Sequence, residues 1–429
     1  MISSIDRELI IKLLQREVIP AIGCTEPIAV AFGVARAAAI VGEEPQSIEV
    51  QLSANVLKNA MGVGIPSTGM TGLPIAIALG ATIGRAEYGL EVLRDVTPEA
   101  VEVAKKIIDA EKIKIALSEE SEDKLYIKVV LKSKSHSSVV IIASGHTNII
   151  FESKDNIVLL DKVSNVGSAD EDPTVELSMR RVYDFAMETP SEDLRFIMES
   201  KRLNLSAAER ALKGNYGHNI GLLMSAGATG SLFGDTTFTK ILSYTSAACD
   251  ARMAGAMIPV MSNSGSGNQG IAATLPVVIY ASEHNASEEQ LLRALTLSHL
   301  TVIYMKEKLG RLSAMCGCVV AATGSSCGVT YLMGGNYTQV TYAVKNMVAN
   351  LTGIICDGAK PSCALKISSG VSTAIISAAM ALNNSCVSSV EGIIDNDVDK
   401  CIENLTIIGS DAMNITDGYV LDIMTSKGC

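Results

Sequence analysis

The feature that most constrains the fold is a change of residue pattern along the chain. Between residues 112 and 162, short runs rich in valine and isoleucine, such as KLYIKVVLKS and SSVVIIASG, alternate with turn residues. Runs of this kind predict a β-meander with one exposed face. After about residue 190, nearly every segment instead carries apolar residues at helical spacing. We therefore expect an α+β fold class, with an N-terminal mixed α/β domain containing an antiparallel sheet and a C-terminal all-α domain.

Local signals place the other N-terminal elements. Thr25 and Thr97 are expected helix N-caps, because each is followed by a proline in the first turn. The polar, glycine-rich stretch 55–72 is expected to be a loop. Helices are expected at 4–17, from Thr25 onward, at 73–84 and at 97–110, and a strand at 47–55.

A chain of 429 residues is long enough to bury more than one core. We expect an α+β domain at residues 1–165 and an all-helical domain at residues 190–429. The polar and acidic stretch 166–189 is expected to link them. Aromatic residues make up only 4% of the chain and tryptophan is absent, so the helices must pack through small and aliphatic side chains.

Charge and hydropathy restrict the partners. The net charge is −11 and no stripe of Lys and Arg is visible, so no nucleic-acid partner is expected. Residues 253–282 and 367–390 carry no charge, but polar and glycine-rich stretches interrupt both, so we expect buried helices and no membrane span.

The charged helical start MISSIDRELIIKLLQ is not a signal peptide. A cytoplasmic location is therefore expected, with the ten cysteines reduced, metal-binding or reactive.

Five of the ten cysteines lie between Cys316 and Cys363. Thiols gathered among glycine, serine and small apolar residues suggest a soft metal or an iron–sulfur cluster. The spacings do not match the C-x₂-C runs of small ferredoxins or the usual zinc ligand pairs. Because free cysteines are commonly buried as small hydrophobic residues, the pattern alone leaves both a cluster and a plain core open. The five are Cys316, Cys318, Cys327, Cys356 and Cys363.

Cys24 comes directly before a predicted helix. The helix dipole and the free N–H groups of the first turn favour a thiolate there, which predicts a lowered pKa. Such a thiolate could act as a base or a nucleophile. An inert buried thiol is the alternative.

Two polar stretches are candidate substrate-binding loops. SNSGSGNQG at 262–270 matches a dinucleotide fingerprint only by pattern, since no βαβ unit surrounds it; it is better suited to hold a small carboxylate. The stretch 55–72 lacks Gly-Lys-Ser/Thr and is no P-loop, but it could bind the polar end of a small acid. Plain connecting loops are the alternative in both cases. The candidate residues are Ser264 and Asn268 in the first, and Asn55, Lys58, Asn59, Ser67 and Thr68 in the second.

Two histidines and one arginine complete the candidates. His146 in GHTN and His218 in GNYGHNIG could act as acids or bases, although a single histidine is more often structural. Arg252 lies in a nearly neutral segment. It is expected to pair with Asp250 or another buried carboxylate, or else with a substrate carboxylate.

With these residues in view, the chain resembles the L-cysteine desulfidases, which are related to the iron–sulfur L-serine dehydratases through their alpha-chain domain. The motifs that carry the resemblance extend over nearly the whole chain. They are PAIGCTEP at 20–27, NVLKNAMGVGIP at 55–66, GNYGHNIG at 214–221, DARMAGAMIPVMSNSGSGNQG at 250–270, CGCVVAATGSSCG at 316–328 and DGAKPSCALK at 357–366.

The resemblance implies a [4Fe–4S] cluster held by Cys316, Cys356 and Cys363, with one iron left open as a Lewis acid. It implies that Cys24 is the base in a β-elimination of L-cysteine to pyruvate, ammonia and sulfide, without redox chemistry and without pyridoxal phosphate. The two polar stretches, with His146, would hold the amino acid. The C-terminal Cys429 could cap the open iron, as in some serine dehydratases of the superfamily, and Cys318 and Cys327 stay unassigned.

Two alternatives remain open at this stage. The same fold could act on L-serine, in which case the resemblance implies a histidine base in place of Cys24. In a different class of function, the chain could bind a cluster and sense redox state without catalysis. The expected partner is a small amino acid substrate, and a homo-oligomer is compatible with the sequence.

Overall fold

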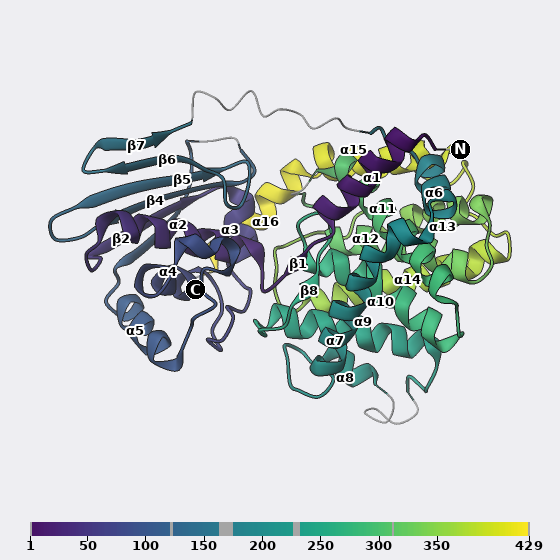
Figure 1. Cartoon of the computed structure of the whole chain (residues 1–429), viewed down its shortest axis with the longest axis horizontal. Coiled ribbons are helices and arrows are strands. Elements are labelled where there is room, and N and C mark those ends of the chain that lie inside the picture. The colour runs from purple at the N-terminus through teal and green to yellow at the C-terminus, as the bar shows by residue number, and fades with distance from the viewer. Residues whose placement is uncertain (1, 121–122, 163–174, 226–231, 311–312, 428–429) are drawn as a thin grey trace.

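The computed structural model describes residues 2–120, 123–162, 175–225, 232–310 and 313–427. The described chain forms two bodies side by side, one built around a sheet and one built of helices (Figure 1). The expected α+β class is confirmed, with the sheet in the N-terminal half and helices in the C-terminal half.

A six-stranded sheet with the strand order β3-β2-β4-β5-β6-β7 forms one layer of the first body. Strands β4 to β7 form an antiparallel meander, as expected. The pairing of β2 with β3 is parallel, with Val50 opposite Ile115, so the sheet is mixed rather than purely antiparallel. The strands are β2 (Ser47–Leu52), β3 (Ile113–Leu117), β4 (Tyr126–Lys132), β5 (Ser137–Ala143), β6 (Ile149–Lys154) and β7 (Ile157–Asp161).

The parallel pair follows from what lies between its two strands. Parallel neighbours need a long crossover, usually helical. The segment between β2 and β3 supplies one, because it consists of helices that return the chain to the same end of the sheet (Figure 1). These helices are α3 (Ala54–Ala60), α4 (Leu73–Thr82), η1 (Ala86–Glu91) and α5 (Pro98–Asp109).

Helix α2 (Thr25–Val41) lies between the sheet and α4. Its alanine-rich sequence suits this place, because a side chain at Gly80 of α4 would come within 2.6 Å of the Ala31 carbonyl oxygen of α2. Cys24, rather than the expected Thr25, is the N-cap of α2. Thr97 is the N-cap of α5, as expected, and its side chain accepts a hydrogen bond from the Ala100 N–H.

The helical body is organised around α12 (Gly317–Leu332), which packs against four other helices. Thirteen of its residues from Cys318 to Thr330 are buried, and small residues allow the close approach. Its neighbours are α10 (Gly267–Glu283), α11 (Glu288–Leu309), α13 (Tyr337–Leu351) and α14 (Cys363–Leu382). Around them lie α6 (Met179–Glu188), η3 (Ser191–Ile197), α7 (Met198–Ala211), α8 (Ile220–Met224), α9 (Thr237–Met253), α15 (Val398–Ile407) and η4 (Ile408–Ala412).

The N-terminal helix packs in the helical body, and the C-terminal helix packs in the sheet body. In α1 (Ser4–Glu17), the buried Ile10 and Leu14 join the core of the helical body. In α16 (Asn414–Ser426), the buried Leu421 joins the core of the sheet body. The stretch 166–189, expected to be a linker, contains α6 in its described part. The domain boundaries at 1–165 and 190–429 therefore remain predictions.

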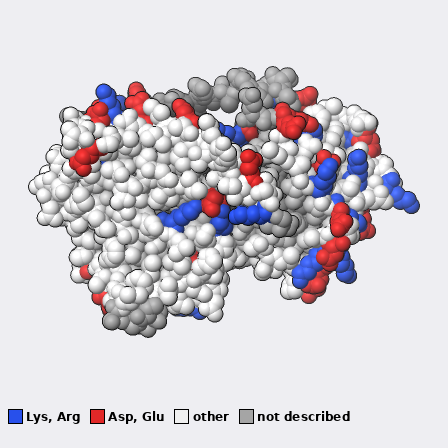
Figure 2. All heavy atoms as spheres, turned by 180° about the vertical axis from the view of Figure 1, so that it is seen from behind, with Lys and Arg blue, Asp and Glu red and all other residues white. Residues whose placement is uncertain are grey.

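The distribution of surface charge and the apolar helix α14 bear on which macromolecules or membranes the protein could contact. Seen from behind, charged side chains gather around the rim and the middle of the molecule, while a broad area over the helical body carries none (Figure 2). One described helix, α14, is long and apolar enough to cross a membrane by length and composition. Its most apolar window is 44% buried against other helices, and core helices commonly pass the same test.

Candidate active site

A short two-stranded sheet brings the segment before Cys24 to the helical body. Strand β1 (Pro20–Ala21) pairs antiparallel with β8 (Val260–Met261). Two further backbone hydrogen bonds continue this contact, from Ser262 N to the Ile19 carbonyl at 2.8 Å and from Ser264 N to the Glu17 carbonyl at 3.0 Å. PAIGC and SNSGSG are therefore held side by side, although they lie more than 200 residues apart in sequence.

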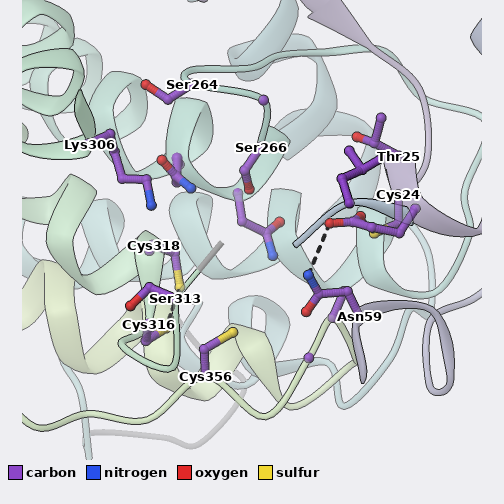
Figure 3. Close-up of a pocket in the computed structure, with 18 of the residues that line it drawn as sticks. Cys24, Thr25, Asn59, Ser264, Ser266, Lys306, Ser313, Cys316, Cys318 and Cys356 are labelled. Atoms are coloured by element: carbon purple, nitrogen blue, oxygen red, sulfur yellow. Dashed lines mark hydrogen bonds between the residues drawn. The ribbon is translucent and has the colours of Figure 1, made fainter. Parts of the chain in front are cut away.

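A cavity of about 250 Å³ opens between the two bodies at this contact. Figure 3 shows Cys24 and Thr25 on the right, Lys306 on the upper left, and Cys316, Cys318 and Cys356 below Lys306 on the lower left. The sheet body contributes Cys24, Thr25, Glu26, Asn59, residues 123–125, Ser144 and His146. The helical body contributes Arg252, residues 264–266, Asn268, Gln269, Lys306, Ser313, residues 315–318, Cys356, Gly358, Ala359 and Cys363.

The structure brings most of the candidate residues to this cavity. Cys24, Asn59, His146, Ser264, Asn268, Cys316, Cys356 and Cys363 line it. Asn55, Lys58, Ser67 and Thr68 do not. The C-terminal Cys429 lies outside the described residues.

The residues that miss the cavity belong to a segment that was expected to be a loop. NVLKNA instead forms helix α3, whose buried face holds Val56, Leu57 and Ala60. Lys58 is also buried and forms an ion pair with Asp417 of α16. Thr68 stabilises the turn in which it lies, because its hydroxyl donates a hydrogen bond to the Ile65 carbonyl at 2.7 Å. A substrate role for these residues is therefore not supported by their positions.

The environment of Cys24 reverses the expected shift of its pKa. The thiol is only 4% exposed, and burial, followed by the charge of Glu26, raises its pKa well above the ordinary value. The positive charge of Arg252 acts in the opposite direction but is the smaller effect. The expectation of a lowered pKa was wrong, because the cost of burying a thiolate exceeds the help of one helix terminus.

Glu26 organises the contacts of Cys24. The Cys24 thiol donates a hydrogen bond to Oε2 of Glu26 at 3.1 Å. The Asn59 amide donates to Oε1 of the same carboxylate at 3.0 Å (Figure 3, dashed line). A nucleophile or base whose partner is itself oriented by a third group is a common catalytic arrangement.

Arg252 fastens the segment before Cys24 to the SNSGSGNQG segment. Its Nη2 donates to the Gly23 carbonyl at 2.9 Å, and its Nη1 donates to Oδ1 of Asn268 at 3.1 Å. An ion pair with Asp250, one of the expected alternatives, is not present among the described residues. Asp250 instead accepts a hydrogen bond from the Gly221 N–H at 3.0 Å, and burial raises its pKa to about 6. Arg252 is thus a buried cation at the cavity, and its two Nη groups donate to the neutral oxygens of Gly23 and Asn268.

Four of the five crowded cysteines converge on the cavity. Cys316 is the N-cap of α12, and its N–H donates to the Ile354 carbonyl at 2.9 Å. The Cys356 N–H donates to the Ala314 carbonyl at 2.6 Å, so the two thiol-bearing segments run together. The sulfur atoms of Cys316 and Cys318 lie 3.2 Å apart. Cys363 is the first residue of α14.

This donor set is compatible with an iron–sulfur cluster. No three His, Cys, Asp or Glu side chains of the described residues could hold one metal ion together. A cluster makes a different demand, because each thiolate binds a separate iron and the sulfur atoms stay apart. Cys316, Cys356 and Cys363 meet that demand, because they line one cavity and come from three different segments of the chain. Cys327 does not line the cavity and is fully buried in the helical core.

Several cavity residues were not candidates from sequence. Glu26 and Gln269 lie inside the motifs PAIGCTEP and SNSGSGNQG, which drew attention to other residues, and Lys306 lies in no motif. Lys306 is 5% exposed, which is unusual for a lysine. In sequence it looks like one member of the charged end MKEKLG of a helix. Only the tertiary contacts distinguish it from Lys308, which is exposed.

Comparison with known proteins identifies the family. Residues 87–422 match the family model described as the serine dehydratase alpha chain, well over half of the chain. The chain belongs to the serine dehydratase alpha chain family. Membership implies a lyase of the serine dehydratase type that acts on a small amino acid. Cys24 lies before the matched region.

Relatives that are similar over the full length carry the name "UPF0597 protein". One from Phocaeicola vulgatus is 64% identical and covers 100% of both chains. One from Bacteroides thetaiotaomicron is 63% identical over 99% of both chains, and one from Shewanella halifaxensis is 43% identical over 98% of both chains. These names state no activity, so the substrate within the family is a matter for proposal.

Proposed function

We propose that this protein is an iron–sulfur lyase that converts L-cysteine to pyruvate, ammonia and sulfide by β-elimination, and that it works in the cytoplasm. The observation that carries the proposal is the placement of Cys24 in one cavity with Cys316, Cys356 and Cys363. These residues come from opposite ends of the chain and from both bodies. A cavity of about 250 Å³ suits a small amino acid.

Cys316, Cys356 and Cys363 would hold the cluster, with Cys318 as the nearest substitute for one of them. When bound, a cluster with three protein ligands supplies an open iron, which is a Lewis acid for the leaving sulfur. The polar segment at Ser264 to Asn268 lies beside these thiols, where the body of an amino acid would fit. This polar pocket supports an enzyme rather than a non-catalytic redox sensor.

Cys24 is the proposed base. Its Sγ would accept the α-proton of the substrate as the bond between Cβ and the leaving sulfur breaks. The products are sulfide and 2-aminoacrylate, which takes up water to give pyruvate and ammonia. Glu26 and Asn59 hold the Cys24 side chain in position for this transfer. Cys24, Asn268 and Gln269 are each at most 6% exposed, so little of their surface meets bulk water.

The pH dependence of turnover follows from the raised pKa of Cys24. Only the thiolate can accept the α-proton, so kcat/KM should still be rising with pH above neutrality. Glu26 raises the pKa of Cys24 and Arg252 lowers it. Other charged or titratable groups that line the cavity are Asp123, Lys124, His146, Lys306 and the cluster thiols. A rate that falls steadily from pH 7 to pH 9 would contradict Cys24 as the base.

The substrate test is an anaerobic panel with reconstituted protein, in which sulfide and pyruvate are measured separately. L-cysteine should give both products, and Cys24→Ala should lower kcat by about 10²- to 10⁴-fold while leaving the iron content unchanged. Cys327→Ala is the matched control, because it removes a buried thiol outside the cavity. Iron-free protein without turnover after careful anaerobic preparation would overturn the proposal.

L-serine is the second candidate substrate, and the family description favours it. On this alternative, pyruvate forms faster from serine than from cysteine. Cys24→Ala then distinguishes the two, because a serine enzyme with a histidine base keeps its turnover. His146 is the histidine that lines the cavity and would be the residue to change next.

A further inference from the structure

We propose that Cys316 and Cys318 form a reversible oxidation site. In the metal-free protein, a small peroxide joins their two sulfur atoms in a disulfide, which withholds Cys316 from iron until a dithiol reductant reopens the bond. The inference rests on the proposed function only in taking Cys316 as a cluster ligand. It gives a role to Cys318, which the proposed set of three ligands leaves without one.

The two sulfur atoms are in contact with each other. They lie 3.2 Å apart, next to each other on one side of the cavity (Figure 3). Among the cysteines that the structure describes, no other two share a hydrogen bond. A disulfide bond is about 2.0 Å long, so the two sulfur atoms need to approach by only about 1 Å. Cys316 and Cys318 are therefore the pair of thiols best placed to react with each other.

The backbone around the pair permits the bond. Cys316 is the N-cap of α12 in an extended conformation, and Cys318 is the second residue of the helix. Two steps along a chain limit the distance between their Cα atoms to about 7 Å, and the helical conformation of Gly317 shortens it. A disulfide needs about 4.4–6.8 Å between the Cα atoms. The bond therefore requires rotation of two side chains and only a local adjustment of the backbone.

The size of the cavity limits which oxidant can reach the pair. Both residues line the cavity of about 250 Å³, and they are only 4% and 6% exposed. Hydrogen peroxide is small enough to enter, whereas a disulfide carried by another protein is too large to reach either sulfur. The site is therefore specific for small peroxides.

The chemistry needs one molecule of peroxide. One of the two thiols, as its thiolate, attacks a peroxide oxygen, the O–O bond breaks, and a sulfenic acid and one water molecule form. The other thiol then attacks the sulfenic sulfur, and the hydroxyl group leaves as a second water molecule while the S–S bond forms. The two thiols lose two electrons and the peroxide gains them.

The consequence is that the disulfide and iron exclude each other at Cys316, because a metal ligand must be a thiolate. The bond spans only three residues, so loop closure stabilises it little, and a strained disulfide is readily reduced. Without Cys318, a sulfenic acid on Cys316 is open to further oxidation to a sulfinic acid, which dithiols do not reverse. Cys318 thus protects a ligand position of the cluster.

The first test uses mass spectrometry on metal-free protein. The protein is treated anaerobically with a small excess of hydrogen peroxide, labelled with iodoacetamide in urea and digested with trypsin, which leaves Cys316, Cys318 and Cys327 in one peptide. This peptide should lose two hydrogen atoms and carry the label on Cys327 alone, and dithiothreitol should restore labelling of the pair. Label on both Cys316 and Cys318, or a bond from Cys316 to Cys356, overturns the proposal.

Two variants separate this pair from the other thiols. Cys327→Ala is the matched control, because it leaves only Cys316 and Cys318 in the peptide and should form the same bond. In Cys318→Ala, sulfinic acid on Cys316 should be roughly tenfold more abundant than in the wild type after the same treatment. Its iron uptake after peroxide and dithiothreitol should also fall severalfold, whereas that of the wild type recovers. Equal amounts of sulfinic acid on Cys316 in both proteins overturn the protective role of Cys318, and this measurement needs no bound iron.

The same treatment of the reconstituted holoprotein connects the pair to the cluster. The disulfide should appear only in the fraction of protein that has released its iron. A bond that forms while all the iron stays bound overturns the proposal, because Cys316 is then not a ligand. The expected bond in a protein that releases no sulfide from L-cysteine supports the oxidation site and overturns the proposed reaction, so the two failures are distinguishable.

Discussion

His299 is a fully buried imidazole beneath the segment that carries Ser264. Its Nδ1 accepts a hydrogen bond from the Asn263 amide at 3.0 Å, and its Nε2 pairs with the Thr274 hydroxyl at 3.1 Å. Burial lowers its pKa from 6.5 to about 3. The ring is therefore neutral in the folded protein over the whole physiological range, and it serves as a fixed hydrogen-bond partner rather than as an acid or base.

The first prediction concerns acid stability. Because the folded-state pKa of His299 is lowered, the unfolded chain binds its proton first as pH falls below 6.5. Each further pH unit should remove about 1.4 kcal/mol of unfolding free energy, or about 3 kcal/mol by pH 4.5. His299→Gln should remove this share of the pH dependence, although it is less stable at pH 7. Urea unfolding of both proteins from pH 7 down to about 4.5 measures it, and parallel stability curves would exclude the buried ring as the cause.

Some properties of individual site residues could be predicted from the sequence, and those that depend on burial could not. The resemblance to the desulfidases singled out Cys24, Cys316, Cys356 and Cys363, and these four residues line one cavity. It could not give the pKa direction at Cys24, because the number of atoms around a thiol depends on both bodies. Lys306 gave no signal at all, since its burial arises only from tertiary packing around α11.

At the scale of elements, the helices with clear caps were predictable and the pairing of strands was not. Helix α5 begins as Thr97 and Pro98 indicate, because those signals act locally. The parallel pairing of β2 with β3 depends on the helices between them returning the chain to the same end, which no residue in either strand specifies. Helix α3 was missed because Asn55, Lys58 and Asn59 suggested a loop, while Val56, Leu57 and Ala60 form its buried face.

The contact between the loop after α3 and the end of α9 gives the second prediction. The Gly64 N–H donates to the Met253 carbonyl at 3.0 Å, and a side chain at Gly64 would lie 2.3 Å from the Ala254 backbone. Backbone cannot move aside as a flexible side chain can, so Gly64→Ala should push the two bodies apart locally. The expected loss of unfolding free energy is about 1–3 kcal/mol, with a loss of kcat because Cys24 is displaced from the helical wall.

Gly418→Ala is the matched control for that substitution. Gly418 lies inside α16, and a side chain there would meet nothing within 4 Å. Alanine is a better helix former, so this variant should gain about 0.5–1 kcal/mol. Chemical denaturation measures both variants. If Gly64→Ala is as stable as Gly418→Ala, the close approach of the two backbones is not a constraint on the fold.

At the scale of the whole molecule, the two bodies are tied together by the exchange of terminal helices. Helix α1 packs into the helical core, and α16 packs onto the sheet body, so each body contains a segment from the far end of the chain (Figure 1). The cavity lies at the junction and needs both bodies to be complete. Whatever holds α16 in place therefore also holds the geometry of the cavity.

The third prediction tests this connection through the ion pair between Lys58 and Asp417. The Lys58 side chain is 2% exposed and that of Asp417 is 17% exposed. Asp417→Asn leaves a buried ammonium without its counter-charge and should lower the unfolding free energy by about 3 kcal/mol, the lower end for a broken buried pair. Asp422→Asn, on an exposed part of the same helix, should have no effect. The double variant Lys58→Met with Asp417→Asn should recover most of the loss, since no charge then remains buried.

The variants at Asp417 that lower the unfolding free energy should also weaken the retention of iron and the catalysis that depends on it, because Lys58 lies beside the segment that carries Cys356. A side chain at Gly358 would come within 2.1 Å of the Lys58 carbonyl oxygen. Burial raises the pKa of the Cys356 thiol, and the charge of Lys58 offsets part of that rise. In Asp417→Asn, iron should be lost faster during anaerobic dialysis than in Asp422→Asn, at equal temperature and pH. If the two proteins lose iron at the same rate while their stabilities differ, α16 stabilises the fold without supporting the cluster site.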